Sequence, residues 1–213
     1  MDGGEGSDAY VYDSTSDVVT GEIINDTGTA GSDAISVSGN TDFSNLAGSI
    51  SGVEVIDLQA NVTATLAYGD VLGPPMDVSG DNASIGSETL ILQGTSGGET
   101  IDIASSGVGF SGDWTDGDVV QIEGLGGGDT LAGPTNEEGY LLGGDGDDAL
   151  TGGNQNDTLD GGAGNDNLDG GAGDNTLSYA SESSSVSIDL GGTSKGGVAS
   201  GDTITYASFK NLI

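Results

Sequence analysis

The chain has 213 residues, of which 35 are Asp or Glu and only 2 are Lys or Arg, giving a formal net charge of −33. It has no Cys and no His, which excludes disulfides, thiolate or imidazole metal sites and Ser-His-Asp catalysis within these residues. So large a negative charge opposes a compact fold unless cations are bound, and it argues against nucleic acid as a partner. No apolar run is as long as a membrane-spanning helix, so we expect no membrane insertion.

The first recognisable pattern is a nine-residue unit close to the start of the sequence. Gly3 to Val11 reads GGEGSDAYV, with Asp8 at its sixth position and Tyr10 at its eighth. A repeat that begins directly after Met1 and Asp2 lacks the atypical capping unit that usually ends a repeat array. The sequence also stops at Ile213 without a polar cap, so we expect the native protein to continue at both ends.

Residues 10–123 contain short runs in which apolar and polar residues alternate, separated by turn-forming clusters about every ten residues, a spacing typical of stacked short strands. Asn61 to Leu72 is the best helical candidate, but its Thr and Val content argues against a helix. We expect residues 12–123 either to continue a solenoid, which we favour, or to form a separate β-sandwich. The predicted strands are YVY, AISVSG, VEVIDLQ (53–59), VTATLAY (62–68), SETLILQ (87–93) and ETIDIA (99–104).

Three weaker features lie in the same region. Gly94 to Asp102, GTSGGETID, looks like a nonapeptide with Glu99 at its sixth position. Gly21 to Asp26 reads as a degenerate turn or, more simply, as a strand, EII. We expect Trp114 to pack over a strand end and not to serve as a ligand platform.

The nonapeptide returns at Gly124 and then becomes regular. Gly124 to Ala132 reads GLGGGDTLA and is followed by an imperfect ten-residue unit, Gly133 to Leu142. Gly143 to Ser178 then contains four consecutive blocks, each with a Gly pair first, an acidic or amide residue sixth and Leu eighth. The blocks are GGDGDDALT, GGNQNDTLD, GGAGNDNLD and GGAGDNTLS.

The period predicts how these residues meet in space. Nine residues divide into a six-residue turn and a three-residue strand, and two such units complete one coil. Asp148 and Asp166 then share one edge of the stack, and Asp157 and Asn175 share the other. Carboxylates together with backbone carbonyls in glycine turns suit calcium, which tolerates irregular oxygen coordination. Each block buries essentially one Leu, so we expect folding and metal binding to be coupled.

The tandem blocks resemble the calcium-binding repeats of RTX proteins, secreted by Gram-negative bacteria. The strict motif covers about a fifth of the chain, Gly143 to Ser178 and Gly3 to Val11. The flanks are similar, more loosely, to linking stretches of large RTX surface proteins. The resemblance implies calcium as the cofactor and type I secretion to the outside of the cell, with folding there.

The family's ligand scheme can be carried over residue by residue. One turn supplies the carbonyls of its second and fourth residues and its Asp, and the next turn on that edge supplies those of its first and third and its Asp. The first site would take Gly144, Gly146, Asp148, Gly161, Ala163 and Asp166. The second would take Gly153, Gln155, Asp157, Gly170 and Ala172, with Asn175 in place of Asp and Gln155 in place of Gly. The third would join Leu125, Gly127 and Asp129 to Gly143, Asp145 and Asp148, where a spacing of 19 requires a bulge. Gly4, Gly6 and Asp8 offer half a site with no assigned partner.

The expected fold class is therefore all-β, a right-handed parallel β-roll or β-solenoid with calcium-binding turns. We expect an irregular β region at 1–123, either a less regular solenoid or a sandwich. A β-roll should follow at 124–178, and a β extension at 179–213 should lead into further repeats.

The expected function is a non-enzymatic, calcium-dependent structural or spacer module of a bacterial surface protein, such as an adhesin or S-layer-like array. Its partners would be calcium and neighbouring repeats of the same or identical chains, with a glycan or the cell surface as a further candidate. The alternative is the accessory repeat region of a secreted protease, lipase or alginate epimerase. A glycan- or ice-binding sandwich ranks last. Asp113, Asp116 and Asp118 could mimic paired catalytic carboxylates, but acidic turns explain them better.

Overall fold

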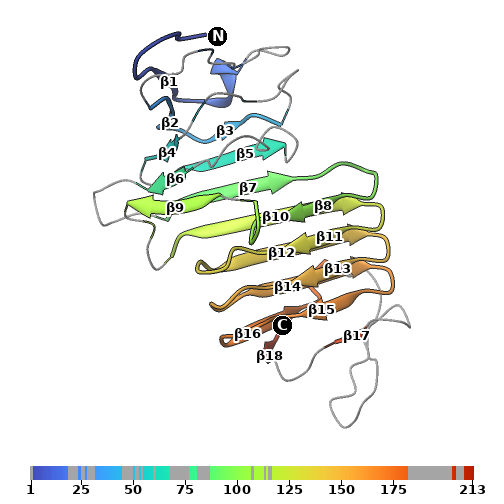
Figure 1. The fold of residues 1–213 in the computed structure, drawn as a ribbon. Coiled ribbons are helices and arrows are strands. Elements are labelled where there is room, and N and C mark those ends of the chain that lie inside the picture. Colours follow the sequence, from blue (N-terminus) through green and yellow to red (C-terminus); the bar gives the residue numbers. More distant parts are fainter. Residues whose placement is uncertain are drawn as a thin grey trace. The chain divides into compact units, whose positions relative to one another are not determined.

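A computed structural model of the chain describes residues 2–18, 24, 27, 32–44, 50, 53, 55–59, 61–67, 77–80, 87–106, 108–112, 114, 117–181, 203–204 and 209–213. Among these residues the one helical element is η1, a 3-10 helix at Thr15–Asp17. The strand pairings described there are parallel. The fold is therefore all-β, a β-solenoid in which successive coils add strands to parallel sheets (Figure 1). The predicted fold class is confirmed.

The chain divides into two compact units. Unit 1 comprises Met1–Leu92 and Ser105–Val119, and unit 2 comprises Gln93–Ala104 and Val120–Ile213.

Unit 1 contains two sets of parallel strands. The first set runs in the order β1-β2-β4-β6-β9 and the second in the order β3-β5-β7. Parallel pairing between strands of successive coils is the arrangement of a solenoid, whereas a sandwich would be built from antiparallel strands. The bounds are Ala9–Tyr12 (β1), Ala34–Val37 (β2), Thr41–Asp42 (β3), Val55–Leu58 (β4), Thr63–Ala67 (β5), Asp77–Gly80 (β6), Thr89–Gln93 (β7) and Gly109–Gly112 (β9).

The coils of unit 1 are long and unequal. Hydrogen-bonded side chains and backbone groups at equivalent places in successive coils are 25, 21 and 22 residues apart. The first sheet has room for two inward-facing apolar residues on each of β1, β2 and β4, for example Ile56 and Leu58. Tyr12 meets Phe43 edge to face, with ring centroids 4.9 Å apart. The core of this unit is therefore broad and partly aromatic.

Unit 2 has shorter and more regular coils. One sheet runs in the order β17-β15-β13-β11-β8, and the other continues from β10 through β12, β14 and β16 to β18 (Figure 1). The bounds are Thr100–Asp102 (β8), Val119–Gly126 (β10), Thr130–Ala132 (β11), Gly139–Asp145 (β12), Ala149–Thr151 (β13), Thr158–Ala163 (β14), Asn167–Asp169 (β15), Asn175–Ser178 (β16), Thr203–Ile204 (β17) and Phe209–Leu212 (β18).

The core of unit 2 is a ladder of single aliphatic residues. Leu131, Leu150 and Leu168 pair in register in one sheet, and each is at most 1% exposed. Leu141, Leu159 and Leu177 pair in register in the facing sheet, and each is at most 3% exposed. In the nonapeptides these leucines occupy the eighth position, because that residue of each short strand points inward.

Most of the predicted strands are present, with one difference in length. β11, β13 and β15 have the expected three residues, but β12 and β14 have seven and six. They are longer because the glycines that follow the buried Leu are still paired between the two strands, as Gly144 is with Gly162. The described part of the helical candidate, residues 61–67, holds strand β5. The feature at 21–26 lies outside the described residues except for Ile24.

Candidate metal centre in the stacked acidic turns

Glycines at the second and fourth positions of the repeats adopt backbone conformations that other residues rarely take. Gly144 has a φ of 107° and Gly146 a φ of 140°. A Cβ on Gly144 would lie 2.3 Å from the carbonyl oxygen of Leu125, and one on Gly146 would lie 1.6 Å from that of Gly127. The coil beneath therefore directs the carbonyls of its own second and fourth residues at these glycines. Leu125 itself has a φ of 73°, so this turn keeps the conformation without the glycine.

In the regular nonapeptide turns the sixth residue has a buried side chain that accepts a hydrogen bond from an N–H of the coil beneath. The N–H of Asp129 donates to Oδ1 of Asp148 over 2.8 Å, and the N–H of Asp148 donates to Oδ1 of Asp166 over 2.9 Å. Glu99, which replaces Asp at the sixth position of its turn, donates its N–H to Oδ1 of Asp129. We call Glu99, Asp129, Asp148 and Asp166 the acidic ladder. It lies on one edge of unit 2, and its three Asp side chains are at most 3% exposed.

The second carboxylate oxygens of the ladder face a space that contains further oxygens. The Oδ2 atoms of Asp129 and Asp148 are buried without a hydrogen-bond partner. A Cβ on Gly143 would lie 2.3 Å from Oδ2 of Asp148 and 2.4 Å from the carbonyl oxygen of Gly161. A glycine, a carboxylate oxygen and a carbonyl from the next coil thus enclose one small space, and buried oxygens without a donor are costly.

The electrostatics of these carboxylates reflect their burial. Loss of water raises the pKa of Asp148 to about 6, although its bond from the Asp129 N–H lowers it, and neighbouring carboxylates add to the rise. Burial also raises the pKa of Asp129, against the bond from the Glu99 N–H, and the charge of Glu99 adds to it. A bound cation would remove this penalty, because it stabilises the ionised form.

The residues of the first expected site fit calcium. The structure places the turns of Asp148 and Asp166 directly above one another. Among the described residues no three acidic side chains converge, so a cation here would rest on two carboxylates and on backbone carbonyls. The carbonyl of Ala163 already accepts the N–H of Gly146, but its oxygen has a second lone pair. Six or more oxygens of mixed origin are what calcium accepts. The residues that would hold it are Gly144, Gly146, Asp148, Gly161, Ala163 and Asp166.

The third expected site has the same stacking without the expected bulge. The 19-residue step is uniform from Val120 paired with Gly139 through Ala132 paired with Thr151. The extra residue of the ten-residue unit lies on the opposite edge, where the N–H of Gly139 donates to Oδ1 of Asp157, 18 residues on. The two turns of this site are therefore superposed like those of the first site. One turn holds Leu125, Gly127 and Asp129, and the other holds Gly143, Asp145 and Asp148.

The second expected site differs, because hydrogen bonds already engage its side chains. Asp157 accepts the N–H of Gly139 at Oδ1 and that of Gly153 at Oδ2, both over 2.7 Å. The Nδ2 of Asn175 donates to the carbonyl of Gly170 over 2.7 Å and to that of Ala172 over 2.9 Å. The structure brings these residues together, but Asn175 has the donor Nδ2 beside Gly170 where Asp148 has the acceptor Oδ2 beside Gly143. Gln155 lies in the same turn, and its carbonyl points at Gly173 in the coil above.

At the start of the chain the structure supplies the partner that Asp8 lacked. The N–H of Asp8 donates to Oδ1 of Asp33 over 2.8 Å, and the Oδ2 of Asp8 is buried with no hydrogen-bond partner. Gly4 and Gly6 have positive φ values of 83° and 126°, like their counterparts in unit 2. Sequence reasoning missed Asp33, although Gly28, Gly31, Asp33 and Ile35 stand at positions one, four, six and eight of a nonapeptide.

Unit 1 also contains stacked turns in which glycine is scarce. The N–H of Glu88 donates to Oδ1 of Asp118, and the N–H of Asn61 donates to Oε1 of Glu88. Asp118 is 3% exposed, so it acts as a turn cap, while Asp113 and Asp116 lie outside the described residues. The signal that could have identified these caps is an acidic residue two positions before a buried apolar one. Trp114 packs on Phe110, with ring centroids 5.1 Å apart.

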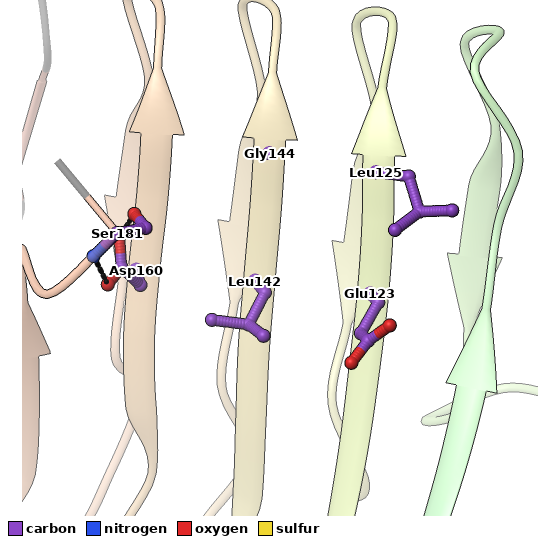
Figure 2. Close-up of a pocket in the computed structure, with 6 residues that line it drawn as sticks. All are labelled: Glu123, Leu125, Leu142, Gly144, Asp160 and Ser181. Atoms are coloured by element: carbon purple, nitrogen blue, oxygen red, sulfur yellow. Dashed lines mark hydrogen bonds between the residues drawn. The ribbon is translucent and has the colours of Figure 1, made fainter. Parts of the chain in front are cut away.

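A pocket lies on the second sheet of unit 2, and its lining includes Leu125 and Gly144 from the turns that lead to Asp129 and Asp148. Figure 2 shows Glu123, Leu142 and Asp160 side by side on β10, β12 and β14. The carboxylate of Asp160 accepts bonds from Ser178 Oγ over 2.9 Å and from the Ser181 N–H over 3.2 Å. The buried carboxylate of Asp160 thus holds residues 178–181 in place where the chain leaves β16.

Comparison with known protein families agrees with this geometry. Residues 142–177 match the model of the RTX calcium-binding nonapeptide repeat in four copies. This segment is an RTX repeat array. RTX repeats bind calcium, so calcium is the cofactor of the chain. Such repeats are typical of proteins exported by type I systems, which supports an extracellular location for this RTX module.

The other comparisons add no relatives. No curated protein and no solved structure matches the chain significantly. No helix within the described ranges has the length and apolar character needed to cross a membrane.

Proposed function

We propose that the chain is a non-enzymatic structural module of a bacterial surface protein, such as an adhesin or S-layer-like array, that becomes rigid when it binds calcium outside the cell. The observation that carries this proposal is the acidic ladder, in which buried carboxylates stack coil upon coil along one edge of unit 2. Such a stack repels itself without cations and holds the coils together with them, because each ion contacts two successive turns.

The small core of unit 2 supports the same proposal. Each strand of the β11-β13-β15 ladder buries one Leu, which contributes roughly 1.5–3 kcal/mol, while ordering each residue costs on the order of 1.5 kcal/mol. Metal binding therefore has to contribute to folding. A calcium-dependent stiffness is suited to a spacer that stays unfolded in the calcium-poor cytosol and folds after export.

The decisive experiment is hydrogen exchange on the whole chain with calcium, with magnesium and with chelator. We expect the amides of β11, β13 and β15 to be protected with calcium and to exchange rapidly with chelator. Magnesium should not replace calcium, because it requires a stricter octahedral geometry. Repeats that stay protected and heat-stable in chelator would overturn the proposal.

A mechanical measurement tests the spacer role separately from calcium binding. Held between two handles and pulled, the module should unfold at a clearly higher force with calcium than with chelator. Equal unfolding forces with calcium and with chelator would contradict a mechanical spacer role, even if the chain binds calcium. A full-length gene that encodes a catalytic domain would instead favour the accessory region of a secreted enzyme.

A further inference from the structure

We infer that the side-chain amide of Asn175 takes the place of a calcium ion, so that the turn Gly170–Asn175 closes the array without metal and calcium in unit 2 is confined to the acidic-ladder edge. The inference rests on the proposed calcium-coupled folding and specifies which turns take part in it.

The first observation is the position of the amide. Asn175 is fully buried, and its Oδ1 accepts the N–H of Asp157 over 2.8 Å, as the ladder carboxylates accept theirs. Its Nδ2 lies 2.7 Å from where a Cβ of Gly170 would stand. In the ladder the Oδ2 of Asp148 lies 2.3 Å from the corresponding point on Gly143. Nδ2 of Asn175 and Oδ2 of Asp148 therefore occupy the same place in their turns.

The second observation is what the two atoms face. The Nδ2 of Asn175 donates its two hydrogens to the carbonyls of Gly170 and Ala172. Those carbonyls are the two that the family scheme assigns to a calcium ion from this turn. In the ladder an oxygen stands in the same position, and an oxygen that faces carbonyl oxygens is repelled unless a cation lies between them. A neutral amide satisfies these carbonyls directly.

The third observation is that the turn beneath is also closed. Asp157 receives N–H bonds on both carboxylate oxygens, from Gly139 and Gly153. By contrast, the Oδ2 atoms of Asp129 and Asp148 have no hydrogen-bond partner. The edge of Asp157 and Asn175 is thus held by hydrogen bonds to its side chains, whereas the buried Oδ2 atoms of the opposite edge would need a cation. The consequence is a metal-independent closure at the last repeat, next to β16.

The test places a carboxylate on the Asn175 edge and an amide on the acidic-ladder edge. Asn175→Asp puts an oxygen in place of Nδ2 and should create a calcium site, whereas Asp148→Asn is the matched reverse change on the ladder. Calcium bound by each whole chain is counted by native mass spectrometry and by isothermal titration. We expect Asn175→Asp to bind one ion more than the wild type and to lose thermal stability in chelator. Asp148→Asn should bind at least one ion fewer and be more stable in chelator.

Equal calcium counts for the wild type and Asn175→Asp would overturn the inference and leave the calcium-dependent module intact. A wild type that binds no calcium would instead overturn the proposed function. If Asn175→Asp fails to fold, the wild type alone decides. In calcium, the side-chain NH₂ of Asn175 should exchange with solvent far more slowly than an exposed Asn amide in NMR spectra. Exchange at the rate of an exposed amide would show that Nδ2 does not hold the carbonyls.

Discussion

At the scale of single residues, the close approach of one coil to the next determines which glycines are required. Gly144 has a positive φ, and a Cβ on it would lie 2.3 Å from a carbonyl oxygen. Gly126 on the neighbouring strand has no positive φ, and its nearest contact would be 3.7 Å away. We therefore expect Gly144→Ala to destabilise unit 2 by a few kcal/mol, and Gly126→Ala to change its stability by less than about 0.5 kcal/mol. Denaturant unfolding of both variants with calcium measures the difference.

The reciprocal substitution checks that backbone strain is the cause. Leu125 has a φ of 73° and is 46% exposed, so Leu125→Gly removes strain and little packing. It should raise the unfolding midpoint. A lower midpoint would mean that the Leu125 side chain stabilises the turn by more than its backbone costs.

The buried carboxylates make stability without calcium depend on pH. The folded pKa of Asp148 is about 6, above an unfolded value near 3.9. Between these values the folded chain binds more protons than the unfolded chain, so stability decreases as pH rises through this window and stays low above about pH 6. In chelator we expect a lower thermal midpoint at pH 7.5 than at pH 4.5.

Calcium should reverse this trend, because protons compete with it for the same oxygens. Asp148→Asn is the control, and it should flatten the pH dependence in chelator. Asp157, whose burial also raises its pKa to about 6 despite bonds from Gly153 and Gly139, will keep part of the dependence. An unchanged slope in Asp148→Asn would contradict the assignment.

At the scale of the elements, Asp160 decides how the array ends. Its buried carboxylate joins β14 to the turn after β16 through Ser178 and Ser181. Asp160→Ala leaves these donors without an acceptor, at a cost of about 1–3 kcal/mol. We expect faster hydrogen exchange in β16 and unchanged exchange in β11. Asp169→Ala is the control, because Asp169 bonds only locally, to Gly171 in an exposed turn. Equal effects of both variants would contradict an anchoring role.

At the scale of the molecule, the two units have different amounts of core. In unit 1, β1, β2 and β4 each bury two apolar side chains, whereas β11, β13 and β15 of unit 2 bury one. Each additional buried side chain contributes roughly 1.5–3 kcal/mol. We therefore expect unit 2 to unfold at a lower chelator concentration than unit 1. Hydrogen exchange during a chelator titration will show this order, and simultaneous loss of both units would contradict it.

The sequence by itself determined the repeat and its chemistry. Because a Gly pair, an Asp or Asn and a Leu recur every nine residues from Gly143 to Ser178, the parallel coils, the inward Leu and the separate edges for Asp148 and Asp157 could be predicted. These features depend on local spacing, which a single chain displays directly. The ladder position of Glu99 was predicted in the same way and is occupied as expected.

Only the tertiary structure decided which turns stack where the spacing varies. It paired Asp8 with Asp33 across 25 residues, and it placed the extra residue of the ten-residue unit on the edge opposite Asp129. It also showed that the amide of Asn175 bonds the carbonyls of its own turn. The physical reason is that neighbours along the stack are set by the length of each intervening coil. A turn needs a cation when a hydrogen-bond acceptor faces its carbonyls and needs none when a donor does. The repeat pattern does not specify which of the two faces them.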